Sequence, residues 1–141
     1  MPVGNLGPND VVTGDQNDAI TDVAARLESE NVGAVVITDG DEPTGIVTDR
    51  DVALSVANHD DVSSLTAEDV MESDPVTIHE DEEVIELSRT IGEHGVRRIP
   101  IVDDEGSLVG IASLDDLVAT IGEQLEEVSD TIEAQSPEYS P

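Results

Sequence analysis

Apolar and polar positions follow the same order in the two halves of the chain. An apolar stripe spaced i, i+3, i+4, i+7 begins at Ile20, and a second stripe with this spacing begins at Val84. That period places each stripe on one face of an α-helix. A run rich in β-branched residues follows each stripe, Val32 to Thr38 in the first half and Val96 to Val102 in the second. These runs predict strands.

Three further elements repeat at matching places. A short extended segment precedes each helix, a second strand follows a turn with Gly and Asp, and another helix opens directly after that strand. The corresponding ranges are 11–13 and 76–78, 45–48 and 110–113, and 49–56 and 114–121. The order in each half is β-α-β-β-α, and such self-similarity indicates two copies of one supersecondary unit.

Each copy alone is too small for a well-buried core. A unit of about sixty residues leaves one apolar face of its sheet uncovered, and a second unit can cover that face. We therefore predict an α+β fold of two β-α-β-β-α repeats, residues 1–60 and 61–128, packed sheet to sheet with pseudo-twofold symmetry. The apolar positions expected between the sheets are Val35, Ile37, Ile46, Ile99, Ile101 and Ile111.

Two segments stand outside the repeated pattern. The stretch "LTAEDVM", Leu65 to Met71, predicts a short connecting helix with Thr66 as its cap and Asp69 three residues on. Residues 129–141, which end in "EAQSPEYSP", contain Pro, Ser and Glu without an apolar period. We expect this segment to be a disordered acidic tail.

Charge narrows the possible partners. The chain has 34 Asp and Glu against five basic residues, all Arg, and its formal net charge is −29. Binding to nucleic acid or to an anionic membrane requires clustered Lys and Arg, so the net charge argues strongly against both partners. The periodic Val and Ile positions argue against disorder of the whole chain. We expect an acidic shell screened by salt, as in a protein of a halophilic archaeon.

Other features exclude further classes. The chain has no Cys, so it forms no disulfide, thiolate nucleophile or Cys-based zinc site. The N-terminus has neither a basic start nor an apolar run, and no apolar stretch approaches about 20 residues. We expect a soluble cytoplasmic protein. The sequence also contains neither a P-loop nor a Gly-x-Ser-x-Gly elbow.

One sequence motif occurs at equivalent places in both copies, as "GIVTDRDV" from Gly45 and as "GIASLDDL" from Gly110. In each, a hydroxyl residue ends a strand and an Asp stands three residues later, in the first turn of a helix. Free N–H groups of that turn can hold an anion, and the Asp can accept hydrogen bonds from ribose hydroxyls. The alternative is plain helix capping, which needs the same residues. Two instances at equivalent places favour a binding site.

Histidines are weaker candidates. His59 and His79 each precede carboxylates and can be drawn as metal ligands, but their spacing matches no known site, so we interpret both as parts of solvated loops. His94 precedes Gly95 at a predicted helix end, where its charge favours the helix dipole.

The stretches "VGAVVITDGDEPTGIVTDRDV" and "VRRIPIVDDEGSLVGIASLDDL" resemble a tandem pair of cystathionine-β-synthase (CBS) domains, called a Bateman module. The resemblance covers residues 8–122. It implies two clefts between the repeats that bind adenosine derivatives such as AMP, ADP, ATP or S-adenosylmethionine. It also implies a homodimer, for which the helix faces around Val52, Val56, Leu117, Val118 and Ile121 are available.

Site residues follow from the resemblance. Ribose recognition falls on Thr48 with Asp51 and on Ser113 with Asp116. The adenine positions for the Asp51 cleft are Val76, Thr77, Val96 and Ile99, and those for the Asp116 cleft are Val11, Val12, Gly33 and Ala34. Phosphate recognition falls on Arg97 and Arg98, which align with Gly33 and Ala34, so Arg50 is the one nearby basic candidate of the first copy.

The function expected from these features is a regulatory or sensor module without catalytic residues, obligatory cofactor or metal, signalling to an unidentified regulated protein. Two alternatives stay open. One is a structural dimerisation module whose clefts stay empty, and the other is a metal-dependent nucleotide hydrolase. Ligand titration separates the sensor from the first alternative, and turnover of the nucleotide separates it from the second.

Overall fold

The computed structural model describes residues 1–7 and 10–135. The first repeat carries a four-stranded sheet in the order β1-β2-β3-β4, in which β1 is parallel to β2 and the remaining pairs are antiparallel. The elements that form this sheet or lie beside it are β1 (Thr13–Gly14), α1 (Ile20–Ser29), β2 (Ala34–Asp39), β3 (Glu42–Thr48) and α2 (Asp49–Asn58). From the segment that precedes the second repeat they include the 3-10 turn η2 (Val62–Ser64), α3 (Ala67–Val70) and β4 (Glu72–Ser73).

The second repeat carries a three-stranded sheet in the order β5-β6-β7, with β5 parallel to β6 and β6 antiparallel to β7. Its elements are β5 (Ile78–His79), α4 (Val84–His94), β6 (Arg98–Val102), β7 (Leu108–Ser113) and α5 (Leu114–Gln135), and the 3-10 turn η1 (Val3–Asn5) lies near the N-terminus. Irregularities in register fall at equivalent places, between Ile37 and Thr38 and between Ile101 and Val102. The predicted order β-α-β-β-α is confirmed in both copies.

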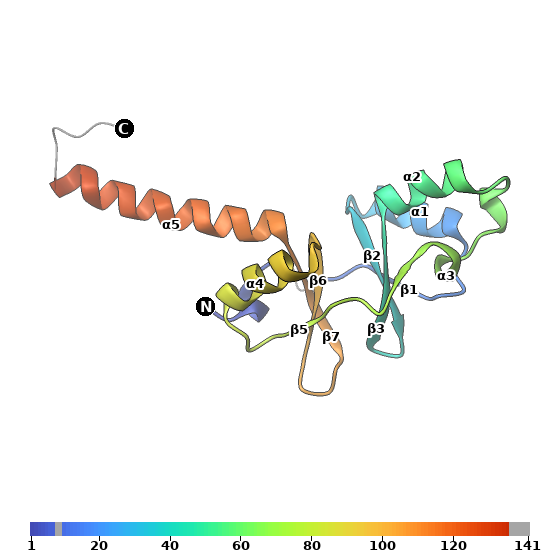
Figure 1. The fold of residues 1–141 in the computed structure, drawn as a ribbon, viewed down its shortest axis with the longest axis horizontal. Helices are drawn as coiled ribbons and strands as arrows, with labels where there is room; N and C mark the ends of the chain where they lie inside the picture. Colours follow the sequence, from blue (N-terminus) through green and yellow to red (C-terminus); the bar gives the residue numbers. More distant parts are fainter. Residues whose placement is uncertain (8–9, 136–141) are drawn as a thin grey trace.

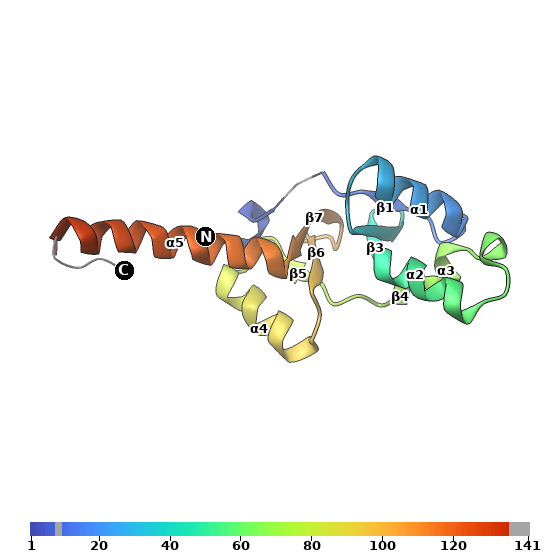
Figure 2. The ribbon, with the colours of Figure 1, turned by 90° about the horizontal axis from the view of Figure 1, so that it is seen from above.

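The two sheets face each other between outer layers of helices (Figure 1). Along the longest axis, α4 and α5 precede the β5-β6-β7 sheet, and the sheet of the first repeat with α1, α2 and α3 follows; the view from above shows the same sequence of layers (Figure 2). The backbone N–H of Leu108 donates to the carbonyl of Asp41 at 2.8 Å and so links the two hairpins. Sheet-to-sheet packing of two repeats is therefore confirmed.

Each repeat has its own core between its sheet and its helices. The first core contains Ile20, Val23, Leu27, Val35, Ile37, Val47 and Ala67, and the second contains Val3, Leu6, Ile78, Leu87, Ile99, Ile101 and Ala112. The prediction that Val35, Ile37, Ile99 and Ile101 lie between the sheets is wrong, because their side chains point to the helices. The buried residues Val36, Ile46 and Pro100 alternate with them and face the opposite sheet.

The segment that precedes each repeat packs on the other repeat. Val3 and Leu6 are buried in the second core, and Ala67 of α3 is buried in the first core. An antiparallel bridge joins Pro2 to Glu83, and its counterpart joins Thr66 to Ala19. The two arms are thus exchanged symmetrically between the repeats.

Two predictions about connecting segments have different outcomes. The short helix α3 is confirmed, and the Asp69 carboxylate accepts hydrogen bonds from the backbone N–H (2.9 Å) and the hydroxyl (3.2 Å) of Thr66. The predicted disordered tail is wrong for residues 129–135, which continue α5 as regular helix. Residues 136–141 lie outside the described residues. No helix among the described residues combines the length and apolar character needed to cross a membrane.

Candidate functional site

Both copies of the repeated motif, which begin at Gly45 and Gly110, form the same hydrogen-bonded capping box. The Asp51 N–H donates to Thr48 Oγ1 at 3.1 Å, and the Thr48 N–H donates to Asp51 Oδ2 at 2.9 Å. Ser113 and Asp116 repeat this exchange at 3.1 and 3.0 Å. The helix-capping interpretation therefore holds at both places. It uses one carboxylate oxygen of each Asp, and Oδ1 has no hydrogen-bond partner among the described residues.

The start of α2 is not an open anion site. The N–H of Asp49 donates to the Gly33 carbonyl at 3.1 Å, the N–H of Arg50 to Asp49 Oδ1 at 2.8 Å, and the N–H of Asp51 to Thr48. The expectation of free N–H groups in this turn is wrong, because the chain itself satisfies them. A phosphate at this place has to be held by side chains.

A cavity of about 500 Å³ lies between the repeats beside Asp51. Its walls come from both copies, so neither repeat forms it alone. From the first repeat and the linker it is lined by Ile46, Thr48, Asp49, Arg50, Asp51, Glu72, Asp74, Pro75 and Val76, and from the second by His94, Gly95, Val96, Arg97 and Arg98. We call this cavity the Asp51 cleft. It brings together the residues predicted for ribose and phosphate and two of those predicted for adenine, Val76 and Val96.

Three of the five arginines of the chain converge on the Asp51 cleft. Arg97 makes one loose ion pair, 3.9 Å from Asp115, and both side chains are largely exposed, so the pair stabilises the fold little. Arg50 and Arg98 have no ion pair within the described part of the chain. Because two of these guanidinium groups have no ion pair among the described residues and the third has only a loose one, the cleft can take an anion despite the acidic chain.

Two predicted adenine residues do not line the Asp51 cleft. The Ile99 side chain is fully buried in the second core, and Thr77 is exposed outside the lining. Sequence reasoning missed Glu72 of β4, Asp74 and Pro75 directly after it, and the end of α4 at His94 and Gly95. Their only signal in the sequence was their nearness to Val76 and Val96.

The equivalent place beside Asp116 is built differently. Gly7 lies against the Asp116 carboxylate, and a Cβ on Gly7 would stand 3.0 Å from Oδ2 and 3.1 Å from the Ile111 carbonyl. The end of the arm of residues 1–7 therefore lies against the Asp116 side chain, which is half-buried. Residues 8–9, which follow Gly7, are outside the described residues.

The walls predicted for the Asp116 cleft are also engaged elsewhere. A Cβ on Gly33 would stand 2.5 Å from Nη2 of Arg98, so the Arg98 guanidinium group lies against this glycine. Val12 packs on the first core, and its carbonyl accepts a hydrogen bond from the Val36 N–H. Val11 and Ala34 are half-buried.

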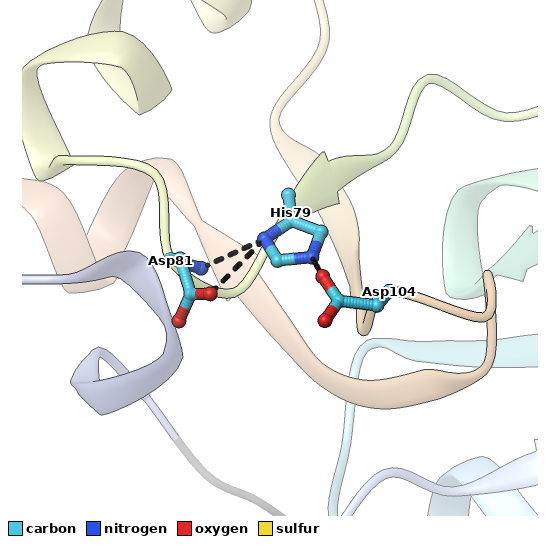
Figure 3. A group of neighbouring side chains, drawn as sticks. All are labelled: His79, Asp81 and Asp104. Carbon is cyan, nitrogen blue, oxygen red and sulfur yellow. Dashed lines mark hydrogen bonds and ion pairs between the residues drawn. The ribbon is translucent and has the colours of Figure 1, made fainter.

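His79 forms a cluster with Asp81 and Asp104 whose geometry resembles a metal site (Figure 3). The Asp81 N–H donates to Nδ1 of His79 at 3.1 Å, which leaves the ring proton on Nε2 to be donated to Asp104 Oδ1 at 2.6 Å. Both ring nitrogens are then engaged in hydrogen bonds within the cluster. The cluster links the loop after β5 to the β6–β7 hairpin.

One group has a shifted pKa. The backbone N–H of Asp15 donates to Asp18 Oδ2 at 2.9 Å, and Arg26 Nη1 donates to the same oxygen at 2.8 Å. The Asp15 hydrogen bond lowers the pKa of the Asp18 carboxyl most, burial opposes it by raising the pKa, and the hydrogen bond and charge of Arg26 lower the pKa further. Asp18 lies outside the Asp51 cleft and so has a structural role.

Comparison with known proteins agrees with this architecture. The family model for the CBS domain matches residues 3–58 and 67–123. The uncharacterized protein MK0525 of Methanopyrus kandleri is 35% identical over 141 residues, covering 94% of this chain and 72% of its own. The CBS domain-containing protein YhcV of Bacillus subtilis is 32% identical over 107 residues, 76% of each chain.

Two solved structures carry ligands. The CBS domain pair of protein MJ0100, in complex with 5′-methylthioadenosine and S-adenosyl-L-methionine, has a TM-score of 0.79 and 26% identity, and covers 88% of this chain and 98% of that one. The CBS domain protein PAE2072 from Pyrobaculum aerophilum, complexed with AMP, has a TM-score of 0.75 and 26% identity, and covers 82% of this chain and 89% of that one.

Proposed function

The chain belongs to the CBS domain family, as a tandem pair of CBS domains, and we propose that it is a regulatory module that binds an adenosine-containing ligand in the Asp51 cleft. The observation that carries the proposal is the meeting of Thr48 and Asp51 from one repeat with Arg97 and Arg98 from the other around one cavity of about 500 Å³. A cavity of this size falls within the usual range for small-molecule sites, about 300–1,000 Å³.

The geometry suggests an orientation for the ligand. Asp51 keeps Oδ1 for the ribose hydroxyls, because the capping box uses Oδ2. Val76 and Val96 offer apolar contacts for the adenine ring, and the guanidinium groups of Arg50, Arg97 and Arg98 offer charge-assisted hydrogen bonds for phosphates. The complexes of MJ0100 and PAE2072 with adenosine derivatives support this class of ligand.

We propose that the Asp51 cleft is the preferred site and that the Asp116 side binds more weakly. Gly7 lies against the Asp116 carboxylate, and the Arg98 guanidinium group lies against Gly33. A ligand at Asp116 therefore has to displace part of the N-terminal arm, whereas the Asp51 cleft is already open.

Calorimetric titration with AMP, ADP, ATP, S-adenosylmethionine and adenosine, in high salt, tests the proposal. Binding of at least one of these ligands is expected, with the nucleotides recovered unchanged by chromatography after hours of incubation. Absence of binding by the whole panel would favour a dimerisation module with empty clefts. Steady release of phosphate from ATP would favour the hydrolase instead.

The role of the arginines has a matched test. Arg97→Ala removes a cleft guanidinium group, and Arg89→Ala removes an exposed arginine of α4 outside the cleft that pairs with Glu86. We expect Arg97→Ala to weaken the nucleotides roughly ten-fold and adenosine little, because one charge-assisted hydrogen bond is lost. Equal losses in the two variants would contradict a phosphate subsite at Arg97.

A further inference from the structure

Helix α5 exposes a continuous apolar stripe that no other part of the described chain covers. Its members follow one another at intervals of three and four residues and are between 45% and 65% exposed. They are Val118, Ile121, Leu125, Val128 and Ile132. We call this stripe the α5 seam. The spacing is that of alternating a and d positions of a coiled coil.

The second half of α5 extends away from both repeats, as Figures 1 and 2 both show. The helix packs on α4 and β7, and its one buried side chain is Leu117 in the second turn. Beyond that contact, the helix continues for several turns without support from its own chain. An isolated helix of this length is marginal in water, so an apolar seam along it indicates a partner.

Charge on α5 is distributed in a way that identifies the partner. The positions that flank the seam, e and g of the heptad, are all neutral: Gly122, Gln124, Ser129 and Thr131. The acidic residues of the same stretch all lie on the remaining positions: Glu123, Glu126, Glu127, Asp130 and Glu133. Because the net charge of the chain is −29, acidic residues would be expected at some of these flanking positions, but none is found there.

Residues at e and g face the partner helix and decide which partner is tolerated. A basic partner would be matched by acidic flanks, and an anionic lipid surface would be repelled by the acidic outer face. A second copy of this acidic chain would be repelled by acidic flanks and is accepted by neutral ones. We propose that α5 forms a parallel two-stranded coiled coil with α5 of a second copy through the α5 seam.

The base of the seam continues into an apolar groove. A cavity of about 490 Å³ lies between α4 and α5, and Ile85, Leu117 and Ile121 supply apolar lining. Ile121 belongs both to this groove and to the α5 seam, and Ile85 of α4 is exposed beside it. Pairing at the seam therefore brings a second apolar surface of the two copies together, which supports a coiled coil too short to be stable alone.

Single cysteines test the pairing directly, because the chain has no native Cys. Val128→Cys places a thiol on the seam, where a parallel pair sets each residue opposite itself within the Cα separation of about 7 Å that a disulfide allows. Asp130→Cys places the thiol on the outer face of the same turn, and its loss of charge reduces repulsion between copies. Both positions are exposed in the single chain, so neither variant threatens the fold.

Mild oxidation of the full-length protein in high salt should convert most of Val128→Cys to a disulfide-linked dimer and leave most of Asp130→Cys monomeric on a non-reducing gel. Equal cross-linking of the two variants, or cross-linking of neither, would overturn the proposal. An antiparallel pair would also fail this test, because it sets residue 128 opposite another position.

A charge placed in the seam gives an independent readout. Leu125→Glu adds one carboxylate at the seam, and Ala134→Glu adds one on the outer face of the same helix. By sedimentation equilibrium we expect the dimer dissociation constant of Leu125→Glu to rise at least about a hundred-fold, because two copies each lose a buried Leu. The constant of Ala134→Glu should change by less than about three-fold. Equal changes in the two variants would contradict pairing at the seam.

Discussion

Two glycines three residues apart, Gly92 and Gly95, have different backbone conformations. Gly92 lies inside α4, and a Cβ there would meet no atom within 4 Å. Gly95 ends the helix in the left-handed region, with φ at 63°, and a Cβ there would also meet no atom within 4 Å. Since packing is the same at both, only backbone preference separates them.

Substitution by alanine should therefore have opposite effects at these positions. Gly92→Ala should stabilise the protein by about 0.5–1 kcal/mol, because alanine is the better helix residue. Gly95→Ala should destabilise it by about 1 kcal/mol, because an L side chain disfavours positive φ. Urea denaturation measures both changes. Shifts of the same sign in the two variants would contradict this view of the α4 end.

The Asp18 carboxylate gives a pH-dependent prediction. Its pKa is lowered in the fold by the Asp15 N–H and by Arg26, so its contribution to stability is present above the unfolded pKa of about 4 and is lost as the pH falls below it. Asp18→Asn should cost about 1 kcal/mol at pH 7 and progressively less as the pH is lowered below about 4. Denaturation curves at several pH values, with exposed Asp60→Asn as a control for lost charge, measure this. A cost that does not depend on pH would contradict it.

At the residue scale, local rules predicted much of the site. The motif from Thr48 to Asp51 predicted either a helix cap or a ribose site. The structure shows the cap, and Oδ1 of Asp51 has no hydrogen-bond partner among the described residues. The satisfied N–H of Asp49 was not predictable, because its acceptor is the carbonyl of Gly33, which lies directly before β2. That contact depends on the tertiary fold.

At the scale of elements, the sequence predicted which segments form strands but not which side of each strand faces the helices. Both faces of β2 and β6 are buried, so their residues are apolar at odd and even positions alike. With no polar face to fix the alternation, the pattern does not distinguish Val35 from Val36. The helix α5 was predicted too short because its acidic outer positions resemble those of a disordered tail.

The dimer faces predicted from the family resemblance need a correction of the same kind. Leu117 is buried within its own chain, and Val52 packs on the first core. Both therefore pack mainly within their own chain. Val56, Val118 and Ile121 are exposed as expected.

The contribution of the N-terminal arm, residues 1–7, to the core of the second repeat can be tested by substitution. Leu6 is 3% exposed and belongs to the core of the second repeat, although it precedes the first repeat in the sequence. Leu6→Ala should cost about 2–5 kcal/mol, because it leaves a cavity in that core. Leu54→Ala, at an exposed site on α2, should cost much less. Comparable losses of unfolding free energy in the two variants would show that the arm does not support the second core.

At the scale of the whole molecule, the net charge of −29 sets the response to salt. Repulsion among exposed carboxylates destabilises the folded chain and is screened by ions, with a Debye length of about 3 Å at 1 M salt. The melting temperature should therefore rise between low and molar salt, most steeply at the low end. Calorimetry in KCl checks this, and a melting temperature that is constant or falls would contradict the expectation of an acidic shell adapted to salt.

The twofold relation between the repeats holds for the backbone but not for the side chains that flank the two clefts. Equivalent backbone contacts recur, since the Leu114 N–H donates to the Arg97 carbonyl as the Asp49 N–H donates to Gly33. The side chains at these paired positions differ, with arginine in one repeat and glycine in the other. The pair of repeats thus keeps one architecture while bringing three arginines to the Asp51 cleft, beside the carboxylates of Asp49, Asp51, Glu72 and Asp74.

The most direct test of the account is calorimetric titration of AMP into three proteins. Asp51→Ala removes the proposed ribose acceptor together with a capping box, and Asp69→Ala removes the capping-box acid of α3 outside the cleft. Relative to the unsubstituted protein, AMP should bind Asp51→Ala roughly ten- to a hundred-fold more weakly, because hydrogen bonds to a charged acceptor are lost, and Asp69→Ala with unchanged affinity. Equal affinity for AMP in Asp51→Ala and Asp69→Ala would contradict the assignment of the ribose site to Asp51.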